Sequence, residues 1–128
     1  MAKKHSPGFL KLANEARANV KETDIERVHA RLSNSGFLLI DVREESEWQA
    51  GHLPNATHLG KGIIERDIEK RVPDPKTPLV LYCGGGYRSA LAADALQRMG
   101  YANVESMAGG FSAWRDAGFE IETDGGDK

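Results

Sequence analysis

The sequence predicts an α/β fold with a parallel sheet, and two observations lead to this prediction. Residues 37–41 and 78–82 are short, almost continuous apolar runs, the pattern of strands that are covered on both faces. Such runs alternate along the chain with segments of helical periodicity, as they do when crossover helices connect parallel strands. In this architecture ligands bind beyond the carboxyl ends of the strands.

The elements follow one another in a simple order. Residues 9–20 place apolar side chains at helical spacing and predict an amphipathic lead-in helix. Thr23 and Glu26 form a candidate capping box before a second helix. The strands are expected at 37–41, 56–59, 78–82 and 103–107, and the later helices at 44–50, 62–72, 87–99 and 110–117.

Composition bounds the class of protein. The chain has 128 residues, of which 28% are charged, and a net charge of −2, which suits one globular domain. This balance gives no electrostatic reason to expect a nucleic-acid partner. No apolar run approaches the roughly 18 residues that span a membrane, and residues 1–20 lack the features of a signal peptide. We therefore expect a cytoplasmic monomer without membrane or nucleic-acid partners.

The only cysteine of the chain, Cys83, follows the strand at 78–82 and begins a glycine-rich turn into the next helix. The glycines at 84–86 can adopt positive φ, so that successive N–H groups turn inward as an anion-binding nest. The first amides of the following helix are unpaired and point back towards the loop. Arg88 adds a fixed positive charge, and the stretch is thus suited to hold an anionic sulfur.

Magnitudes decide whether this loop activates the thiol. A free cysteine is only a few per cent thiolate at pH 7. A helix N-terminus stabilises a nearby anion by about 0.3–2 kcal/mol, and an arginine within about 4–6 Å favours it by a further factor of roughly 10 to 1,000. Together they make the thiolate the major species, whereas the helix alone does not. We therefore interpret Cys83 as a nucleophile.

Other interpretations of the cysteine are weaker. A lone cysteine after an apolar strand is often a small core residue, but the glycines and the arginine favour the nucleophile. A nucleotide P-loop would need a Gly-Lys-Ser/Thr ending, which residues 84–89 lack. A structural zinc site would need further cysteines. The sequence predicts no metal and no cofactor.

Four motifs occur in register along the chain: LLIDVREESEW, GHLPNATHL, LVLYCGGGYRSALAADALQRMGY and GGFSAW. In this order they resemble the rhodanese-like sulfurtransferase domains. The resemblance covers about residues 20–121, which leaves a lead-in helix in residues 1–19 and a tail at 122–128 that we expect to be disordered. It implies a three-layer sandwich with a central, mainly parallel sheet of about five strands flanked by helices.

The resemblance implies an enzyme that carries sulfur as a persulfide on Cys83. The thiolate would attack the outer sulfur of thiosulfate or a similar small anionic donor, and cyanide or a thiol would then remove that sulfur. Arg88 would also attract the donor, and Ser89 would support the start of the helix. The persulfide would be held by a loop of six residues: Gly84, Gly85, Gly86, Tyr87, Arg88 and Ser89.

Two alternatives accompany this hypothesis. The phosphatases that resemble the cell-cycle dual-specificity enzymes have a Cys-x5-Arg loop, whereas Cys83 and Arg88 enclose four residues. A smaller cradle suits one sulfur atom better than a phosphate, so we favour sulfur transfer. The other alternative is a delivery module that exchanges the persulfide with a partner protein.

Candidate supporting residues lie at the end of the first apolar run and just after it. Asp41 would hydrogen-bond the loop amides and Arg43 would shape an anion-attracting entrance, but we favour a structural pair that braces the end of the strand. We interpret Trp48 as a core-facing aromatic residue. We expect His52 and His58 to form local hydrogen bonds rather than to take part in catalysis.

Overall fold

The computed structural model describes residues 5–34 and 36–123 and confirms the α/β fold. One sheet of five parallel strands has the order β1-β5-β4-β2-β3. The strands are β1 (Lys21–Thr23), β2 (Leu38–Asp41), β3 (Ala56–His58), β4 (Leu79–Tyr82) and β5 (Val104–Met107). The helices are α1 (Pro7–Asn19), α2 (Ile25–Arg31), α3 (Glu45–Ala50), α4 (Ile64–Arg71), α5 (Tyr87–Arg98) and α6 (Gly110–Asp116).

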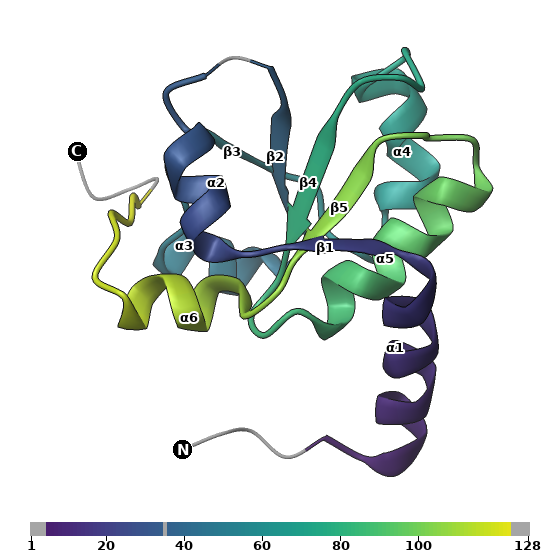
Figure 1. Ribbon diagram of the computed structural model, residues 1–128, viewed down its shortest axis with the longest axis horizontal. Helices are drawn as coiled ribbons and strands as arrows, with labels where there is room; N and C mark the ends of the chain where they lie inside the picture. Colours follow the sequence, from purple (N-terminus) through teal and green to yellow (C-terminus); the bar gives the residue numbers. More distant parts are fainter. Residues whose placement is uncertain (1–4, 35, 124–128) are drawn as a thin grey trace.

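Helices cover both faces of the sheet, as Figure 1 shows: α2 and α6 lie on one side, and α4 and α5 on the other. The central strand β4 explains why a continuous apolar run is needed. Leu79 and Leu81 enter the core under α4 and α5, whereas Val80 and Tyr82 enter the core under α2 and α6. Because successive side chains of a strand point to opposite faces, both sets must be apolar.

Strand β1 was not predicted. Lys21, Glu22 and Thr23 show no apolar pattern, and the strand arises from its pairing with β5 at the edge of the sheet. The predicted capping box of the next helix was also wrong. Asp24 is the N-cap of α2, and its carboxylate accepts the N–H of Arg27 at 2.9 Å. Thr23 is unavailable as a cap because it belongs to β1.

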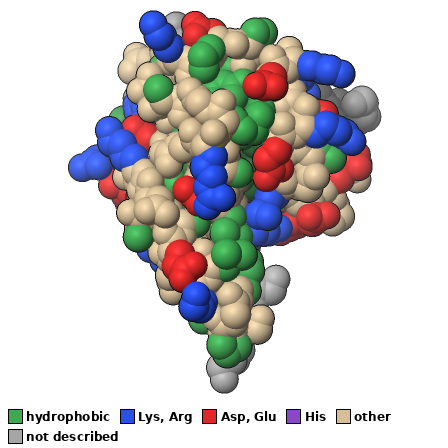
Figure 2. Space-filling model, turned by 90° about the vertical axis from the view of Figure 1, so that its right-hand side faces the viewer, with side chains coloured by type: hydrophobic (Ala, Val, Ile, Leu, Met, Phe, Trp, Pro, Cys, Tyr) green, Lys and Arg blue, Asp and Glu red, His purple; other side chains and the backbone are tan. Residues whose placement is uncertain are grey.

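The first helix lies outside the sandwich. It packs along α5, with Ala13 and Ala16 buried. Its N-terminal end protrudes from the body of the molecule and carries hydrophobic side chains (Figures 1 and 2). Residues 1–4 of the predicted lead-in segment lie outside the described residues. Within the described ranges, no helix is long and apolar enough to cross a membrane.

The chain after α6 turns back onto the sandwich. The indole N–H of the buried Trp114 donates to the carbonyl of Glu120 at 2.7 Å. Glu122 and His52 exchange two backbone hydrogen bonds of 2.8 Å each. The segment predicted as a disordered tail therefore starts with a hydrogen-bonded residue, while 124–128 lie outside the described residues.

The start of α6 packs against the loop that contains the cysteine. The N–H of Phe111 donates to the carbonyl of Cys83 at 2.7 Å, and that of Ser112 donates to the carbonyl of Gly84 at 3.0 Å. This approach requires Gly110, whose φ is +57°. A Cβ there would lie 2.5 Å from the Cys83 oxygen and 2.7 Å from backbone atoms of Gly84.

We expect Gly110→Ala to lower the free energy of unfolding by about 2–5 kcal/mol. A left-handed backbone costs an alanine about 1–2 kcal/mol, and the clash with the loop adds roughly 1–3 kcal/mol. Urea denaturation measures the loss. Gly118→Ala is the matched control, because Gly118 has a φ of +80° but open space around it. Equal losses in the two variants would contradict the proposed clash.

Candidate active site

The sulfur of Cys83 lies at the carboxyl end of β4, where two backbone amides are directed at it. Cys83 is 1% exposed. Its Sγ accepts the N–H of Gly86 at 3.1 Å and the N–H of Ser89, in the first turn of α5, at 3.3 Å. Gly86 has a φ of +102°, the left-handed conformation that the glycine-rich sequence allows. Two such donors favour a negatively charged sulfur over a neutral one.

A chain of buried hydroxyl groups continues from the sulfur. The Ser89 hydroxyl lies 3.5 Å from Cys83 Sγ and 2.8 Å from the Ser106 hydroxyl on β5. Both serines are 0% exposed. Ser106 was not predicted, because its strand also contains Glu105 and so has no continuous apolar run in which a buried serine could be recognised. Its hydroxyl orients that of Ser89, which in turn can donate to a thiolate.

The charge of Arg88 is shared with a carboxylate on α3. Its guanidinium makes a bidentate ion pair with Glu47, at 2.8 and 3.1 Å. The hydrogen bonds from Arg88 are the main cause that lowers the pKa of Glu47 to about 2, against the opposing effect of burial. The same pair, together with the nearby Cys83 sulfur, raises the pKa of Arg88. The sequence predicted the positive charge of Arg88 but not its pairing with Glu47.

Asp41 and Arg43 form a buried pair instead of joining the loop. The Arg43 guanidinium donates to both carboxylate oxygens of Asp41, at 2.8–3.1 Å, and to the carbonyl of Gly51 at 2.6 Å. Asp41 is 0% and Arg43 4% exposed. Burial, followed by the Asp41 carboxylate, raises the pKa of Tyr82. These contacts correspond to the structural interpretation of the pair, and neither residue lines the pocket at Cys83.

The aromatic side chain of α3 is not part of the core. Trp48 is half-buried and stacks on His52 at 3.6 Å between ring centroids, with His58 at 5.1 Å. His52 Nδ1–H donates to the carbonyl of Leu53, and His58 Nε2–H donates to that of Arg43. His52 therefore forms the predicted local hydrogen bond, whereas His58 bonds a carbonyl 15 residues earlier in the chain. The prediction for Trp48 was wrong.

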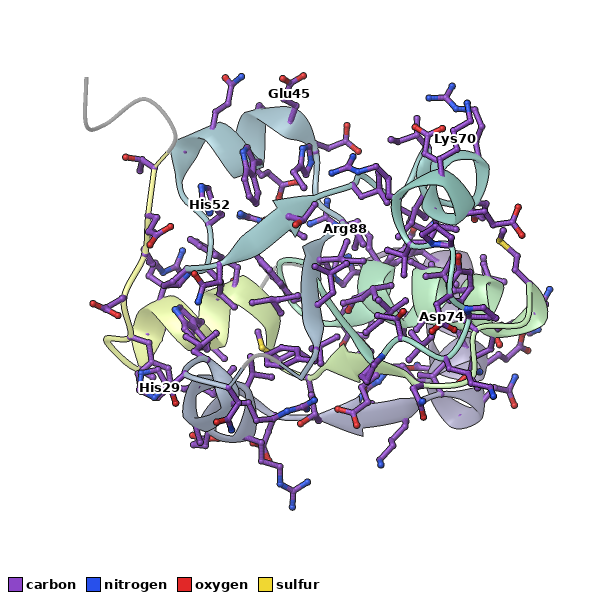
Figure 3. The ribbon with its side chains drawn as sticks, turned by 90° about the horizontal axis from the view of Figure 1, so that it is seen from above. His29, Glu45, His52, Lys70, Asp74 and Arg88 are labelled. Atoms are coloured by element: carbon purple, nitrogen blue, oxygen red, sulfur yellow. The ribbon has the colours of Figure 1, made fainter. Side chains whose placement is uncertain are left out.

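A pocket of about 720 Å³ opens next to Cys83. The loop and α3 form one side of it. The other side is unexpected, because it comes from the N-terminal segment at residues 5–9. Seen from above, Arg88 lies towards the middle of the molecule, whereas Glu45 and Lys70 lie at its periphery (Figure 3). The described residues that line the pocket are His5, Ser6, Phe9, Glu47, Cys83, Gly84, Gly85, Tyr87, Arg88 and Ser112.

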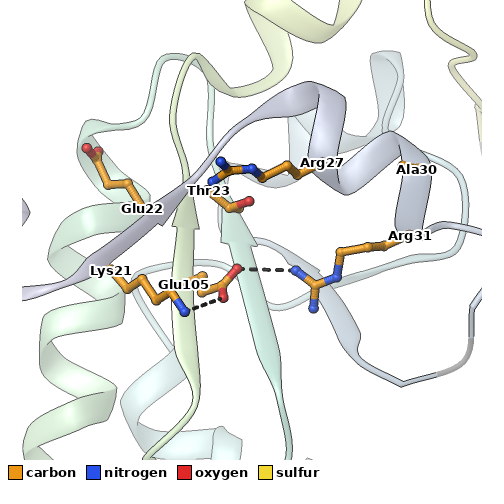
Figure 4. Close-up of a pocket in the computed structure, with 7 residues that line it drawn as sticks. All are labelled: Lys21, Glu22, Thr23, Arg27, Ala30, Arg31 and Glu105. Carbon is orange, nitrogen blue, oxygen red and sulfur yellow. Dashed lines mark hydrogen bonds and ion pairs between the residues drawn. The ribbon is translucent and has the colours of Figure 1, made fainter.

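A second hollow lies between β1 and α2, away from the cysteine (Figure 4). Glu105 at its floor is paired with Arg31 at 3.2 Å and with Lys21 at 3.6 Å. These charges therefore satisfy one another. Among the described residues, no group of three or more His, Cys, Asp or Glu side chains could hold a metal ion, and His29 and His52 lie far apart (Figure 3).

Comparison with known proteins identifies the family. A family model described as Rhodanese-like domain matches residues 24–117. The chain belongs to the rhodanese-like domain family. The thiosulfate sulfurtransferase GlpE of Pseudomonas savastanoi pv. phaseolicola is 38% identical over 84 residues, which are 66% of this chain and 77% of that protein. GlpE of Pseudoalteromonas translucida is 31% identical over 97 residues, 76% and 90% of the two chains. These relatives support a sulfurtransferase activity.

Two solved structures resemble this protein over nearly the whole length of its chain. A protein of unknown function from Rhodopseudomonas palustris, described as a possible tyrosine phosphatase, has a TM-score of 0.81 and 32% identity and covers 95% of this chain and 99% of its own. The polysulfide-sulfur transferase homodimer of Wolinella succinogenes has a TM-score of 0.76 and 26% identity, and covers 93% and 90%. The predicted family and fold are thus confirmed.

The Glu47–Arg88 pair predicts a pH-dependent stability. Because the folded pKa of Glu47 is lowered, its contribution is present above about pH 4.5 and is lost as the pH falls towards about 2. About 1 kcal/mol is expected near pH 6 after solvent screening, since 36% of the side chain is exposed. The measurement is the difference in unfolding free energy between wild type and Glu47→Gln. It should shrink by about half near pH 3, and a constant difference would contradict the assignment.

The hydroxyl chain predicts an effect of Ser106→Ala on the reactivity of the thiol. Loss of one buried hydrogen bond costs about 0.5–1.5 kcal/mol, so we expect alkylation of Cys83 by iodoacetamide near pH 7 to slow roughly threefold to tenfold. Ser112→Ala is the control, since Ser112 is exposed and lines the same pocket. An unchanged rate in Ser106→Ala would show that Ser89 needs no such support.

Proposed function

We propose that this protein is a sulfurtransferase that carries a sulfane sulfur as a persulfide on Cys83. The observation that carries the proposal is the pair of N–H groups, from Gly86 and Ser89, directed at Cys83 Sγ at 3.1 and 3.3 Å. Donors in this arrangement stabilise a thiolate before the reaction and again when the thiolate leaves. The family and its thiosulfate-sulfurtransferase relatives support the same chemistry.

Sulfur transfer takes place in two displacements. The Cys83 thiolate attacks the outer sulfur of thiosulfate, the S–S bond of the donor breaks, and sulfite leaves with the bonding electron pair. Cyanide or a thiolate then attacks the outer sulfur of the persulfide, and the electron pair of that S–S bond returns to Cys83. Neither displacement transfers a proton, so the site needs donors for anionic sulfur rather than a general base.

The loop supplies the place for the outer sulfur. Cys83 Sγ itself is buried, while Gly84 and Gly85 line the pocket beside it. A Cβ on Gly84 would lie 3.2 Å from the Arg88 guanidinium, so the glycine lets that group approach. The outer sulfur would project into the pocket between the loop and Arg88, where an incoming acceptor reaches it.

Sulfur transfer fits the site better than phosphate hydrolysis. The amides of Gly86 and Ser89 bond the cysteine sulfur itself, and the Arg88 guanidinium is engaged by Glu47. Both features reduce what the loop offers to a phosphate dianion. We retain exchange with a partner protein as the alternative route of the persulfide. We also retain the predictions of a cytoplasmic monomer that needs no cofactor.

The decisive test is the intact mass of the reduced protein before and after incubation with thiosulfate. Wild type should gain the mass of one sulfur atom and lose it again on addition of cyanide. Cys83→Ala should show no gain and no turnover above the uncatalysed rate, whereas Ser112→Ala in the same pocket should behave as wild type. Full transferase activity in Cys83→Ala would refute the proposal.

A further inference from the structure

The N-terminal segment completes the pocket at Cys83. His5, Ser6 and Phe9 line it, although they lie before residue 24, where the match to the rhodanese-like family begins. They reach the site because α1 packs along α5, the helix that starts at the cysteine loop. This wall therefore comes from outside the region that the family model matches.

Three aromatic rings form this wall. His5 and Tyr87 lie 4.9 Å apart between ring centroids at an angle of 68°, His5 and Phe9 lie 5.1 Å apart, and Phe9 and Tyr87 lie 6.2 Å apart at 62°. These separations fall within the range of favourable edge-to-face contacts. All three side chains are only half-buried, so the cluster still presents aromatic surface to an occupant of the pocket.

The charged side chains of the pocket give an anionic acceptor no net attraction. Among the described lining residues, Arg88 and Glu47 are the only members of the Lys, Arg, Asp and Glu classes, and they neutralise each other in a bidentate pair. A small dianion gains from an unshared cation and loses from a neighbouring carboxylate. An uncharged molecule with apolar surface suffers no such loss.

The volume of the pocket also favours an organic ligand over a small ion. A volume of about 720 Å³ lies within the roughly 300–1,000 Å³ of sites that hold organic ligands. A cyanide ion or a sulfur oxyanion would leave most of the aromatic wall without contact. The wall becomes useful when the substrate carries an organic group attached to its sulfur.

We propose that His5, Phe9 and Tyr87 bind the organic arm of a thiol acceptor, and that they make this protein pass sulfur preferentially to uncharged thiols with an aromatic group near the sulfur. The assignment rests on the sulfurtransferase function proposed above. In the transfer, the acceptor thiolate attacks the outer sulfur of the Cys83 persulfide and leaves as an organic persulfide. The S–S bond breaks, and its electron pair restores the Cys83 thiolate.

The test measures the second displacement alone. The full chain is loaded with sulfur from thiosulfate, freed of excess donor, and mixed with one acceptor while its intact mass is followed. The acceptors are N-acetyl-phenylalanyl-cysteine amide, N-acetyl-alanyl-cysteine amide and cyanide. The two peptides have the same thiol and no charge, and differ in one aromatic ring. We expect wild type to discharge roughly three- to tenfold faster to the phenylalanyl peptide, the range of one aromatic contact.

Phe9→Ala should abolish this preference and lower the ratio of the discharge rate to the phenylalanyl peptide over that to cyanide. A far-UV circular dichroism spectrum like that of wild type shows that the variant is folded. Leu12→Ala is the matched control: Leu12 lies on the same helix, is 56% exposed, and lines a hollow between α1 and α5 instead. It should keep the preference. Equal rates for the two peptides in wild type, or a preference that survives in Phe9→Ala, would overturn the acceptor assignment but not the proposed sulfur transfer. If wild type takes up no sulfur from thiosulfate, the proposed transfer from this donor fails, and the assignment fails with it.

Discussion

The position of the Cys83 sulfur depends on one backbone contact, between the start of α6 and the loop after β4. Two N–H groups of α6 bind the carbonyls of Cys83 and Gly84, and this fixes the direction in which the loop leaves the sheet. Only then can the amides of Gly86 and Ser89 both face Sγ. The contact requires a residue without a side chain at position 110, so the glycines of the GGF motif belong to the same structural unit as those beside the cysteine.

The charge distribution at the site depends on residues outside the cysteine loop as well as on the loop itself. Backbone N–H groups supply partial positive charge at fixed positions, and burial keeps water from competing with them. The one guanidinium in the described lining is balanced by Glu47. The loop can therefore stabilise one anionic sulfur without making the whole pocket attractive to anions. Separate control of these two properties is what the proposed acceptor preference requires, since that preference rests on shape and apolar contact.

Most of the fold, but only part of the site, could be predicted from the sequence. Strands β2 and β4 could be predicted because a strand buried on both faces has a continuous apolar run. The cysteine loop could be predicted because its backbone conformation favours glycine over other residues. Strand β1 could not, since its edge position imposes no such pattern. The partnership of Arg88 with Glu47, the hydroxyl of Ser106 and the approach of Phe9 join residues far apart in the chain. Such contacts form through tertiary packing, so no local sequence pattern predicts them.

The bond from Trp114 to the carbonyl of Glu120, and the two bonds between His52 and Glu122, lie beyond residue 117, where the family match ends. A chain shortened to that boundary would leave an indole N–H without its acceptor, at a cost of about 1–3 kcal/mol. It would also release the segment that carries His52, on which Trp48 of α3 stacks. The smallest transferable unit of this protein is thus longer than the region that the family model matches. Fusion or domain-grafting work needs the segment that follows α6.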